Sequence, residues 1–374
     1  MRIDKAVLLG ILFLAGCSGD EIVNNYYNDD TPGKLVDYSA FQTDVKKWYN
    51  GHTAALCINY DARYRGVGRD DKIDQSIDEV VNRGLIMDFE LVTDNYVEYP
   101  DIVDQMHNVL APQGIGFFAH GHKHDNHDHF DFDYCYNSFK TCYDYMTLWG
   151  ITPKTYAYPH WAGRNPTTQL ANELAGYIAA RGRAANPDSM LICPGDVKEP
   201  DNWYYLPSAS MAYQFQDYLS DHEALSPVLV AAVLNTAWVI VTYHSIGYPD
   251  GWGYYPFEEF TDDLDLMISL DFWCGHMDDV ACYVMERNNF RIDRTLIKSS
   301  EEMLIYTIYF RDGLDNDTFN QPLTVDFTFE PAEQIKRAEF IPALNSESIY
   351  TVNDDSLRIN LIPDERKYIM TLYK

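Results

Sequence analysis

The sequence has few basic residues and no long apolar segment, and both shortages exclude classes of function. Its 374 residues include 28 Lys and Arg against 57 Asp and Glu, which gives a formal net charge of −29. Nucleic acids and anionic lipid surfaces are polyanions that repel such a chain, so neither is expected as a partner. Hydrophobic residues still make up 46% of the sequence, which is enough for a folded core.

The N-terminal segment has the pattern of an export signal. Residues 6–14 form an apolar run that is much shorter than the ~20 residues of a membrane-spanning helix. The run ends in Leu14-Ala15-Gly16-Cys17, which resembles the lipobox of bacterial lipoproteins, where the cysteine carries the lipid. We expect a signal peptide with lipobox at 1–17, a tether at 18–36, and a lipid on Cys17 that anchors the chain to a bacterial membrane, at the outer membrane or cell surface. The alternative is an ordinary signal peptide with an incidental cysteine.

Six further cysteines follow, and an exported protein permits disulfides between them. Cys135 with Cys142 and Cys274 with Cys282 are the candidate pairs, because they are close in sequence. The alternative is that these cysteines are buried thiols.

Two kinds of periodicity divide the rest of the chain at about residue 300. Before it, apolar runs alternate with helical patterns, which predicts a parallel sheet, open or closed into a barrel, over residues 37–299. Strands are expected near 54–59, 85–93, 115–119 and 238–243, and helices near 73–81, 102–110, 166–178, 257–268 and 277–287. In the helix that begins at Pro166, Leu170, Leu174 and Ile178 share one side. Residues 300–374 alternate at period two, which predicts a small antiparallel β-domain. This domain either caps the barrel or binds sugar, and the lack of an obvious aromatic binding face favours capping.

A cluster of histidines follows one predicted strand directly. Residues 120–129 contain five of the chain's 11 histidines, at the strand end where α/β folds place their sites. Imidazole is the usual ligand of zinc and similar metals, so the cluster predicts a metal site. The alternative is a solvated loop rich in His and Asp.

Two more polar residues end predicted strands, namely Asp61 and His244. Strand ends converge in a parallel fold, so both are expected beside the histidine cluster. A carboxylate near a metal can accept a proton from water, and a histidine opposite can protonate a leaving group. The combination indicates metal-assisted hydrolysis.

These segments resemble the polysaccharide deacetylases, the NodB-homology domains of carbohydrate esterase family four, over residues 50–290. The family's first motif, Thr-Phe-Asp-Asp-Gly, corresponds to Asn59-Tyr60-Asp61-Ala62-Arg63. The His-x-x-x-His motif is matched at His120 and His124, and Arg-x-Pro-Tyr-Gly is matched loosely from Ala157 to Trp161. The final motif, Leu-x-His, corresponds to the strand that ends in His244.

The resemblance implies an irregular, incomplete (β/α) barrel followed by the small antiparallel β-domain. It also implies roles: Asp61 as the base, His244 as the general acid, and His120 and His124 as ligands of a divalent metal, usually zinc. His160, Tyr158 and Trp161 would lie at the oxyanion and substrate, with a backbone N–H near His160 holding the oxyanion. The implied substrate is an acetylated polysaccharide.

Two positions depart from the family pattern. Ala62 replaces an aspartate that ligates the metal, and Ala157 replaces the arginine that orients the base. Candidate replacements for the ligand are Asp61 itself, His122, Asp125 and His127, and for the arginine they are Arg63 and Arg164.

Three functions are therefore compared. The first is a metal-dependent hydrolase that removes O-acetyl groups from xylan-like glycans or N-acetyl groups from glucosamine-type glycans. The second is a catalytically impaired scaffold that binds glycans at a surface. Its stacking residues would come from Trp161, Trp203, Tyr204, Tyr205, Trp252, Tyr254 and Tyr255. The third is metal capture by residues 120–129.

Overall fold

The computed structural model describes residues 40–61, 63–64, 72–186, 189–215, 217–344, 351–353 and 356–374. Chain contacts divide the protein into Met1–Ala40 and Phe41–Lys374, and all the structure described below belongs to the second unit. The predicted signal peptide, Cys17, the tether and Ala62 lie outside the described residues. Among the described helices, none has both the length and the apolar character needed to span a membrane.

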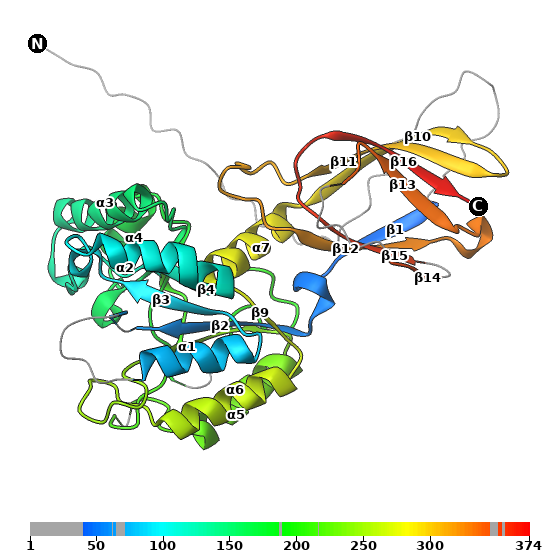
Figure 1. Ribbon diagram of the computed structural model, residues 1–374. Coiled ribbons are helices and arrows are strands. Elements are labelled where there is room, and N and C mark those ends of the chain that lie inside the picture. The colour runs from blue at the N-terminus through cyan, green and yellow to red at the C-terminus, as the bar shows by residue number, and fades with distance from the viewer. Residues whose placement is uncertain are drawn as a thin grey trace, which may run out of the picture. The chain divides into compact units, whose positions relative to one another are not determined.

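The first part of this unit is a parallel β/α half-barrel, as predicted (Figure 1). The strand order is β6-β5-β4-β3-β2-β8-β7, with β9 also beside β2. The strands are β2 (Ala54–Tyr60), β3 (Met87–Leu91), β4 (Ile115–Ala119), β5 (Thr155–Ala157), β6 (Ala179–Arg181), β7 (Ala209–Ser210), β8 (Trp238–Tyr243) and β9 (Phe272–Cys274). Just before β7, Leu206 donates its backbone N–H to Ala180 of β6. Just after β6, the backbone N–H groups of Gly182 and Ala184 donate to Leu206 and Ser208, which narrows the gap between the two edges of the half-barrel.

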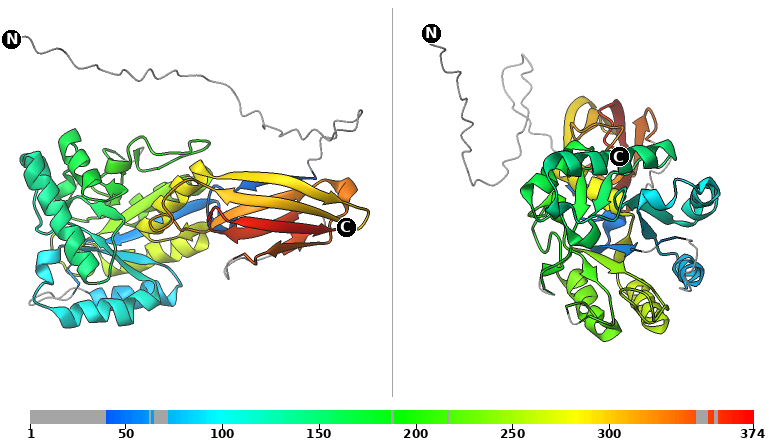
Figure 2. Two further views of the ribbon diagram at one scale, coloured as in Figure 1. Left: turned by 90° about the horizontal axis from the view of Figure 1, so that it is seen from above. Right: turned by 90° about the vertical axis from the view of Figure 1, so that its left-hand side faces the viewer.

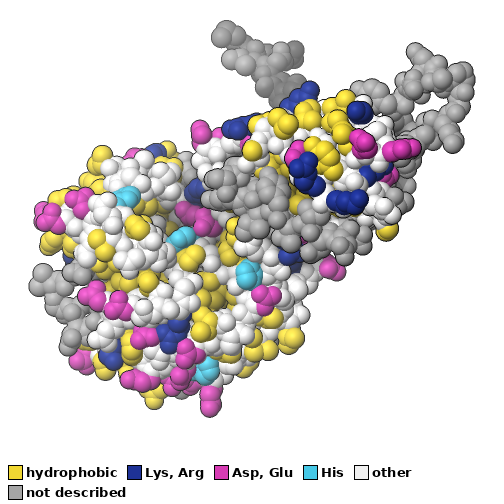
Figure 3. Space-filling view, turned by 45° about the vertical axis from the view of Figure 1, so that its right-hand side comes forward, with side chains coloured by type: hydrophobic (Ala, Val, Ile, Leu, Met, Phe, Trp, Pro, Cys, Tyr) yellow, Lys and Arg dark blue, Asp and Glu magenta, His cyan; other side chains and the backbone are white. Residues whose placement is uncertain are grey.

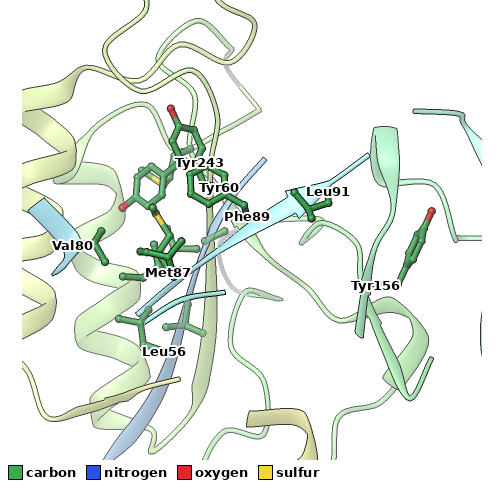
Figure 4. Packing of buried hydrophobic residues seen from close by; sticks show 14 of the residues in the cluster. Leu56, Tyr60, Val80, Met87, Phe89, Leu91, Tyr156 and Tyr243 are labelled. Atoms are coloured by element: carbon green, nitrogen blue, oxygen red, sulfur yellow. The ribbon is translucent and has the colours of Figure 1, made fainter. Parts of the chain in front are cut away.

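Helices surround the outside of these strands, as the end-on view in Figure 2 shows. They are α1 (Ile73–Asn82), α2 (Pro100–Gln105), α3 (Phe132–Leu148), α4 (Pro166–Leu174), α5 (His222–Leu234), α6 (Phe257–Ser269) and α7 (Met277–Asn289). The main apolar core lies between the helices and the sheet. Figure 4 shows Leu56 and Tyr60 of β2 and Met87 and Phe89 of β3 beside Val80 of α1.

The inner face of the sheet carries polar side chains toward the carboxyl ends of its strands, in contrast to the face that packs on the helices. Side chains alternate between the two faces of a strand. Because Ile58 and Tyr60 belong to the outer core, Asn59 and Asp61 point inward. By the same alternation, β3 directs Asp88 and Glu90 inward, and the strand register pairs Asn59 with Asp88. The inner face can therefore carry chemistry at its carboxyl end.

The second part consists of two four-stranded antiparallel sheets, in the orders β1-β12-β15-β14 and β10-β11-β16-β13. Their strands are β1 (Phe41–Val45), β10 (Arg291–Ser299), β11 (Met303–Arg311), β12 (Leu323–Phe329), β13 (Arg337–Ile341), β14 (Thr351–Asn353), β15 (Ser356–Leu361) and β16 (Lys367–Tyr373). One face of β11 is buried at alternate positions, which confirms the antiparallel prediction from period two. The boundary at residue 300 stays a prediction.

The structure decides between the two alternatives for the cysteines and shows which residues of α4 pack. The six cysteines within the described residues are all free thiols. Cys135 and Cys142 both lie on α3, where a separation of seven residues places them about 10 Å apart along the axis, too far for a disulfide. On α4, Leu170 and Leu174 are exposed, whereas the smaller Thr168 and Ala171 are buried.

Glu286 of α7 gives the stability a pH dependence. It is fully buried and accepts the backbone N–H of Gln321, and burial raises the pKa of its carboxyl group to about 8. The folded state therefore holds a proton that the unfolded chain releases at about pH 4.5. Stability from this group is fully present below that pH and is lost as the pH rises toward 8, at up to about 1.4 kcal/mol per pH unit.

We expect Glu286→Gln, which is always neutral, to flatten this pH dependence. Denaturant unfolding between pH 5 and pH 8 measures it. An unchanged slope in the variant would show that another group is responsible.

Candidate metal centre

Polar residues at the carboxyl ends of three strands meet on the inner face. Asp61 follows β2, His120 follows β4, and His244 follows β8, as the sequence predicts. The backbone N–H of Asp61 bonds to Tyr243 and that of His120 to Leu91, so each loop starts from a fixed strand end. The Nε2 atoms of His120 and His244 lie 3.4 and 3.3 Å from Oδ2 of Asp61.

Asp61, His120 and His124 form a group that could hold a metal ion. One ligand atom from each residue lies within 4.8 Å of the others. His120 is 1% exposed, and its Nε2 atom has no hydrogen-bond partner among the described residues. Two imidazoles and a carboxylate are a donor set typical of zinc and other borderline divalent ions. The residues therefore fit a divalent metal.

The protonation states of Asp61 and His124 suit metal binding. Burial would raise the pKa of Asp61, but His120 and His244 together hold it well below its usual value. Burial, together with the nearby His120, lowers the pKa of His124 to about 4. At neutral pH, Asp61 is therefore a carboxylate and His124 a neutral imidazole, which are the forms that bind metals.

The other members of the histidine cluster have structural contacts instead. His127 is buried with Nε2 2.9 Å from Oγ of Ser138, and His122 stacks on Tyr145. Asp125 accepts a hydrogen bond from Tyr134. Of the four candidate replacements for the missing ligand, the metal-binding group contains only Asp61. The other three, His122, Asp125 and His127, lie outside it.

Asp128 ties the histidine loop to the segment after β5. Its carboxylate accepts the backbone N–H groups of Gly163, Arg164 and Asn165 and the hydroxyl of Thr168. These bonds lower the pKa of Asp128 despite its partial burial. The two loops that carry His124 and His160 are therefore held together at the start of α4.

The loop after β5 brings His160 to the centre. Its ring lies 4.5 Å from that of His124, and its Nε2 atom is 3.2 Å from the carbonyl oxygen of His124. His160 and Trp161 both have positive φ, 56° and 50°, which is strained backbone for residues other than glycine. Tyr158, by contrast, is completely buried in the core, and its predicted role at the substrate stays a prediction.

An aromatic surface adjoins His244. The ring of His244 lies 4.7 Å from that of Trp252, which is 53% exposed. Trp161, Phe215 and Tyr218 pack around Trp252, and the guanidinium group of Arg183 lies over Trp161 and Tyr218. Of the predicted stacking residues, Trp161 and Trp252 therefore meet, whereas Tyr255 is buried and bonds to Asp263.

The arginines show where sequence reasoning fell short. Arg63 lines a cavity of about 180 Å³ together with Asp61, Glu90 and His124. Arg164 instead donates to the hydroxyl of Tyr205. Arg181, which the sequence analysis did not select, reaches the inner face and pairs with Glu90. In the sequence, Arg181 is marked only by its charge at the end of the short apolar strand β6.

Acidic side chains are spread over the face of the molecule seen in Figure 3, with basic ones among them. This distribution agrees with the net charge of −29.

No protein-family model matches the sequence, and no curated protein matches it either. Solved structures do show similarity. One is a protein of Mycobacterium smegmatis assigned as a polysaccharide deacetylase, with 15% identity and a TM-score of 0.47 over 65% of this chain and 94% of its own. Another is a family 4 carbohydrate esterase from Streptomyces lividans, with 9% identity and a TM-score of 0.40 over 61% and 95%.

A CE4 family pseudoenzyme from Bacillus anthracis is also similar, with 10% identity and a TM-score of 0.37 over 61% of this chain and 66% of its own. The similarity to polysaccharide deacetylase structures thus extends over about 60% of the chain. The fold class itself follows from the strand order and register of this chain.

Proposed function

We propose that the protein is a metal-dependent hydrolase that removes acetyl groups from a polysaccharide. The observation that carries this proposal is the meeting of Asp61, His120 and His124 within 4.8 Å, with His244 3.3 Å from Asp61. The acetyl group is either O-linked on a xylan-like chain or N-linked on a glucosamine-type chain. The neutral backbone of both glycans suits a protein of charge −29.

In this proposal Asp61, His120 and His124 hold the divalent ion, for which zinc is the first choice because of the mixed nitrogen and oxygen donors. The ion would supply Lewis acidity toward the acetyl carbonyl group. Because Ala62 has no carboxylate, Asp61 is the only residue of the first motif that can supply one. Asp61 has two carboxylate oxygens, so one can face the ion while the other accepts the proton of the attacking water.

His244 is the proposed general acid, and its surroundings fix its position. It is 3% exposed, and Trp252 packs edge-on against its ring. Gly253 has φ +67°, and a Cβ there would lie 2.7 Å from Cβ of His244. Nε2 lies 3.3 Å from Oδ2 of Asp61, and neither ring nitrogen has another partner among the described residues, so a leaving group could meet Nε2 beside Asp61. The strained backbone at His160 supports an oxyanion role for an N–H of that loop.

The aromatic group around Trp252 supports a carbohydrate substrate. Sugar rings present C–H faces that pack on aromatic rings, and the exposed Trp252 lies directly beside the proposed acid. We propose that Trp161 and Trp252 contact the glycan on the His244 side of the centre.

The test is acetate release from acetylated xylan and from an N-acetylglucosamine oligomer, with metal content measured before and after zinc addition. One equivalent of metal with acetate released supports the hydrolase, and the responding substrate identifies the linkage. Metal binding without release from either glycan counts against it.

A second candidate function is glycan binding without catalysis, which Ala157 and the exposed aromatic group favour. It predicts glycan affinity that Trp252→Ala removes, together with no acetate release at saturating metal.

The lipid on Cys17, with attachment to a bacterial membrane at the outer membrane or cell surface, remains part of the proposal.

Asp61→Asn tests the double role of this carboxylate. The amide oxygen remains a weak ligand but no longer accepts a proton, so we expect turnover to fall by about 10²- to 10⁴-fold. Metal content decides between the roles: retained metal makes Asp61 the base, and lost metal makes it chiefly a ligand. Full activity in the variant would exclude both roles.

A further inference from the structure

A buried ion pair contacts His120, and neither of its residues has a catalytic or metal-binding role in the proposed function. Glu90 of β3 and Arg181 of β6 are 2% and 1% exposed. Nε of Arg181 donates to Oε1 of Glu90 at 2.8 Å, and Nη2 donates to Oε2, so the contact is bidentate. Such geometry holds a carboxylate in one orientation.

The fold brings these two residues together across the inner face. Strands β4 and β5 separate β3 from β6 in the sheet, so Arg181 must extend past both to reach Glu90. Ala157 on β5 is the register partner of Arg181 and has only a methyl group, which leaves room for this path. The deacetylase motif has an arginine at the position of Ala157, and here the guanidinium group comes instead from Arg181 on the next strand.

The ion pair touches His120 at Nδ1, the ring nitrogen opposite the one that faces Asp61. Nδ1 of His120 is 3.0 Å from the carbonyl oxygen of Ala157 and 3.2 Å from Oε2 of Glu90. Both neighbours are acceptors, so Nδ1 carries the proton. The opposite ring nitrogen, Nε2, faces Oδ2 of Asp61, 3.4 Å away, and is the atom that would carry the lone pair toward a bound ion.

Burying two charges is costly, and apolar residues of similar size often stabilise a protein as well as an ion pair does. What apolar residues could not supply is an anionic acceptor for His120. A carboxylate behind a histidine ligand fixes its tautomer and makes the opposite nitrogen a stronger donor.

We propose that Glu90 is a positioning residue for the metal centre, and that the bidentate contact with Arg181 holds its carboxyl group in place. This inference rests on the proposed function, because it assumes that His120 ligates an ion through Nε2. It names two residues that none of the motifs discussed above contains.

The test is metal affinity, measured by chelator competition with Zn²⁺ and Co²⁺ on the parent protein and on Glu90→Gln. The variant keeps the shape of the side chain but loses its charge, and we expect the Kd for both ions to rise about 10- to 100-fold. A changed Co²⁺ absorption spectrum should accompany the rise.

Asp88→Asn is the matched control. Asp88 lies on the same strand and face, is buried, and forms its own ion pair with His276, with Nδ1 2.6 Å from Oδ1. Both variants are expected to unfold at lower temperature without metal, but only Glu90→Gln should lose metal affinity. The double variant Glu90→Gln with Arg181→Met should regain stability but not affinity.

Equal metal affinities in Glu90→Gln, Asp88→Asn and the parent would overturn the inference and leave the proposed function standing. Equal losses in the two single variants would likewise reduce the ion pair to a structural role. A parent protein that binds neither ion would overturn the proposed function, and the inference with it.

Discussion

Replacing His120 with alanine is expected to reduce bound metal to background and to abolish acetate release. His120 is the most buried member of the proposed ligand group, and its Nε2 atom has no hydrogen-bond partner among the described residues. Removing it leaves Asp61 and His124, and two protein ligands are fewer than the three that catalytic zinc sites use. Metal content after dialysis and acetate release from the responding glycan measure both effects.

His129→Ala is the matched control for this loss. His129 belongs to the same loop and is exposed, and it lies outside the metal-binding group. The control should keep the metal and the activity of the parent. If His129→Ala lost metal as His120→Ala does, the loop as a whole would bind the ion, which is the metal-capture function compared above.

The arrangement of the strands could be predicted because its signals are local. The apolar runs of β2, β4 and β8 and the period-two pattern of β11 and β12 appear directly in the sequence. Helix α3 was missed because its apolar residues are interspersed with Tyr, Asn and Asp and give a weak pattern. On α4 the smaller residues pack and the leucines are exposed, which depends on how closely neighbouring elements approach.

The ligand group could be predicted for a different reason. Asp61, His120 and His244 each follow a strand, and parallel strands bring their carboxyl ends to one edge. The choice of His124 over His122 or His127 came only from the motif, since spacing alone treats the three alike. Their contacts in the structure separate them: His122 stacks on Tyr145, and His127 bonds to Ser138.

The supporting residues could not be predicted because they depend on pairing across the sheet. Strand β3 is buried, and its residues are apolar except for Asp88 and Glu90. These two acidic residues, spaced two apart, were the available signal in the sequence for a polar inner face. That its partner would be Arg181 follows only from the curvature that brings β3 and β6 together. Trp252 likewise lies in a loop, and its contact with His244 requires the turn at Gly253.

Replacing His244 with alanine is expected to lower turnover by about 10²- to 10⁴-fold while metal content stays at the level of the parent. His244 lies outside the metal-binding group, yet its Nε2 atom is 3.3 Å from Asp61. A residue there can give a proton to the leaving group without holding the ion.

The pH profile separates this role from simple disturbance of the site. Loss of a general acid should remove the alkaline limb of kcat/KM, because no group remains whose deprotonation stops the reaction. A variant that only displaced Asp61 would keep the shape of the profile at a lower rate. Equal metal loss in His244→Ala and His120→Ala would contradict the separation of roles, since it would make both histidines ligands of the same ion.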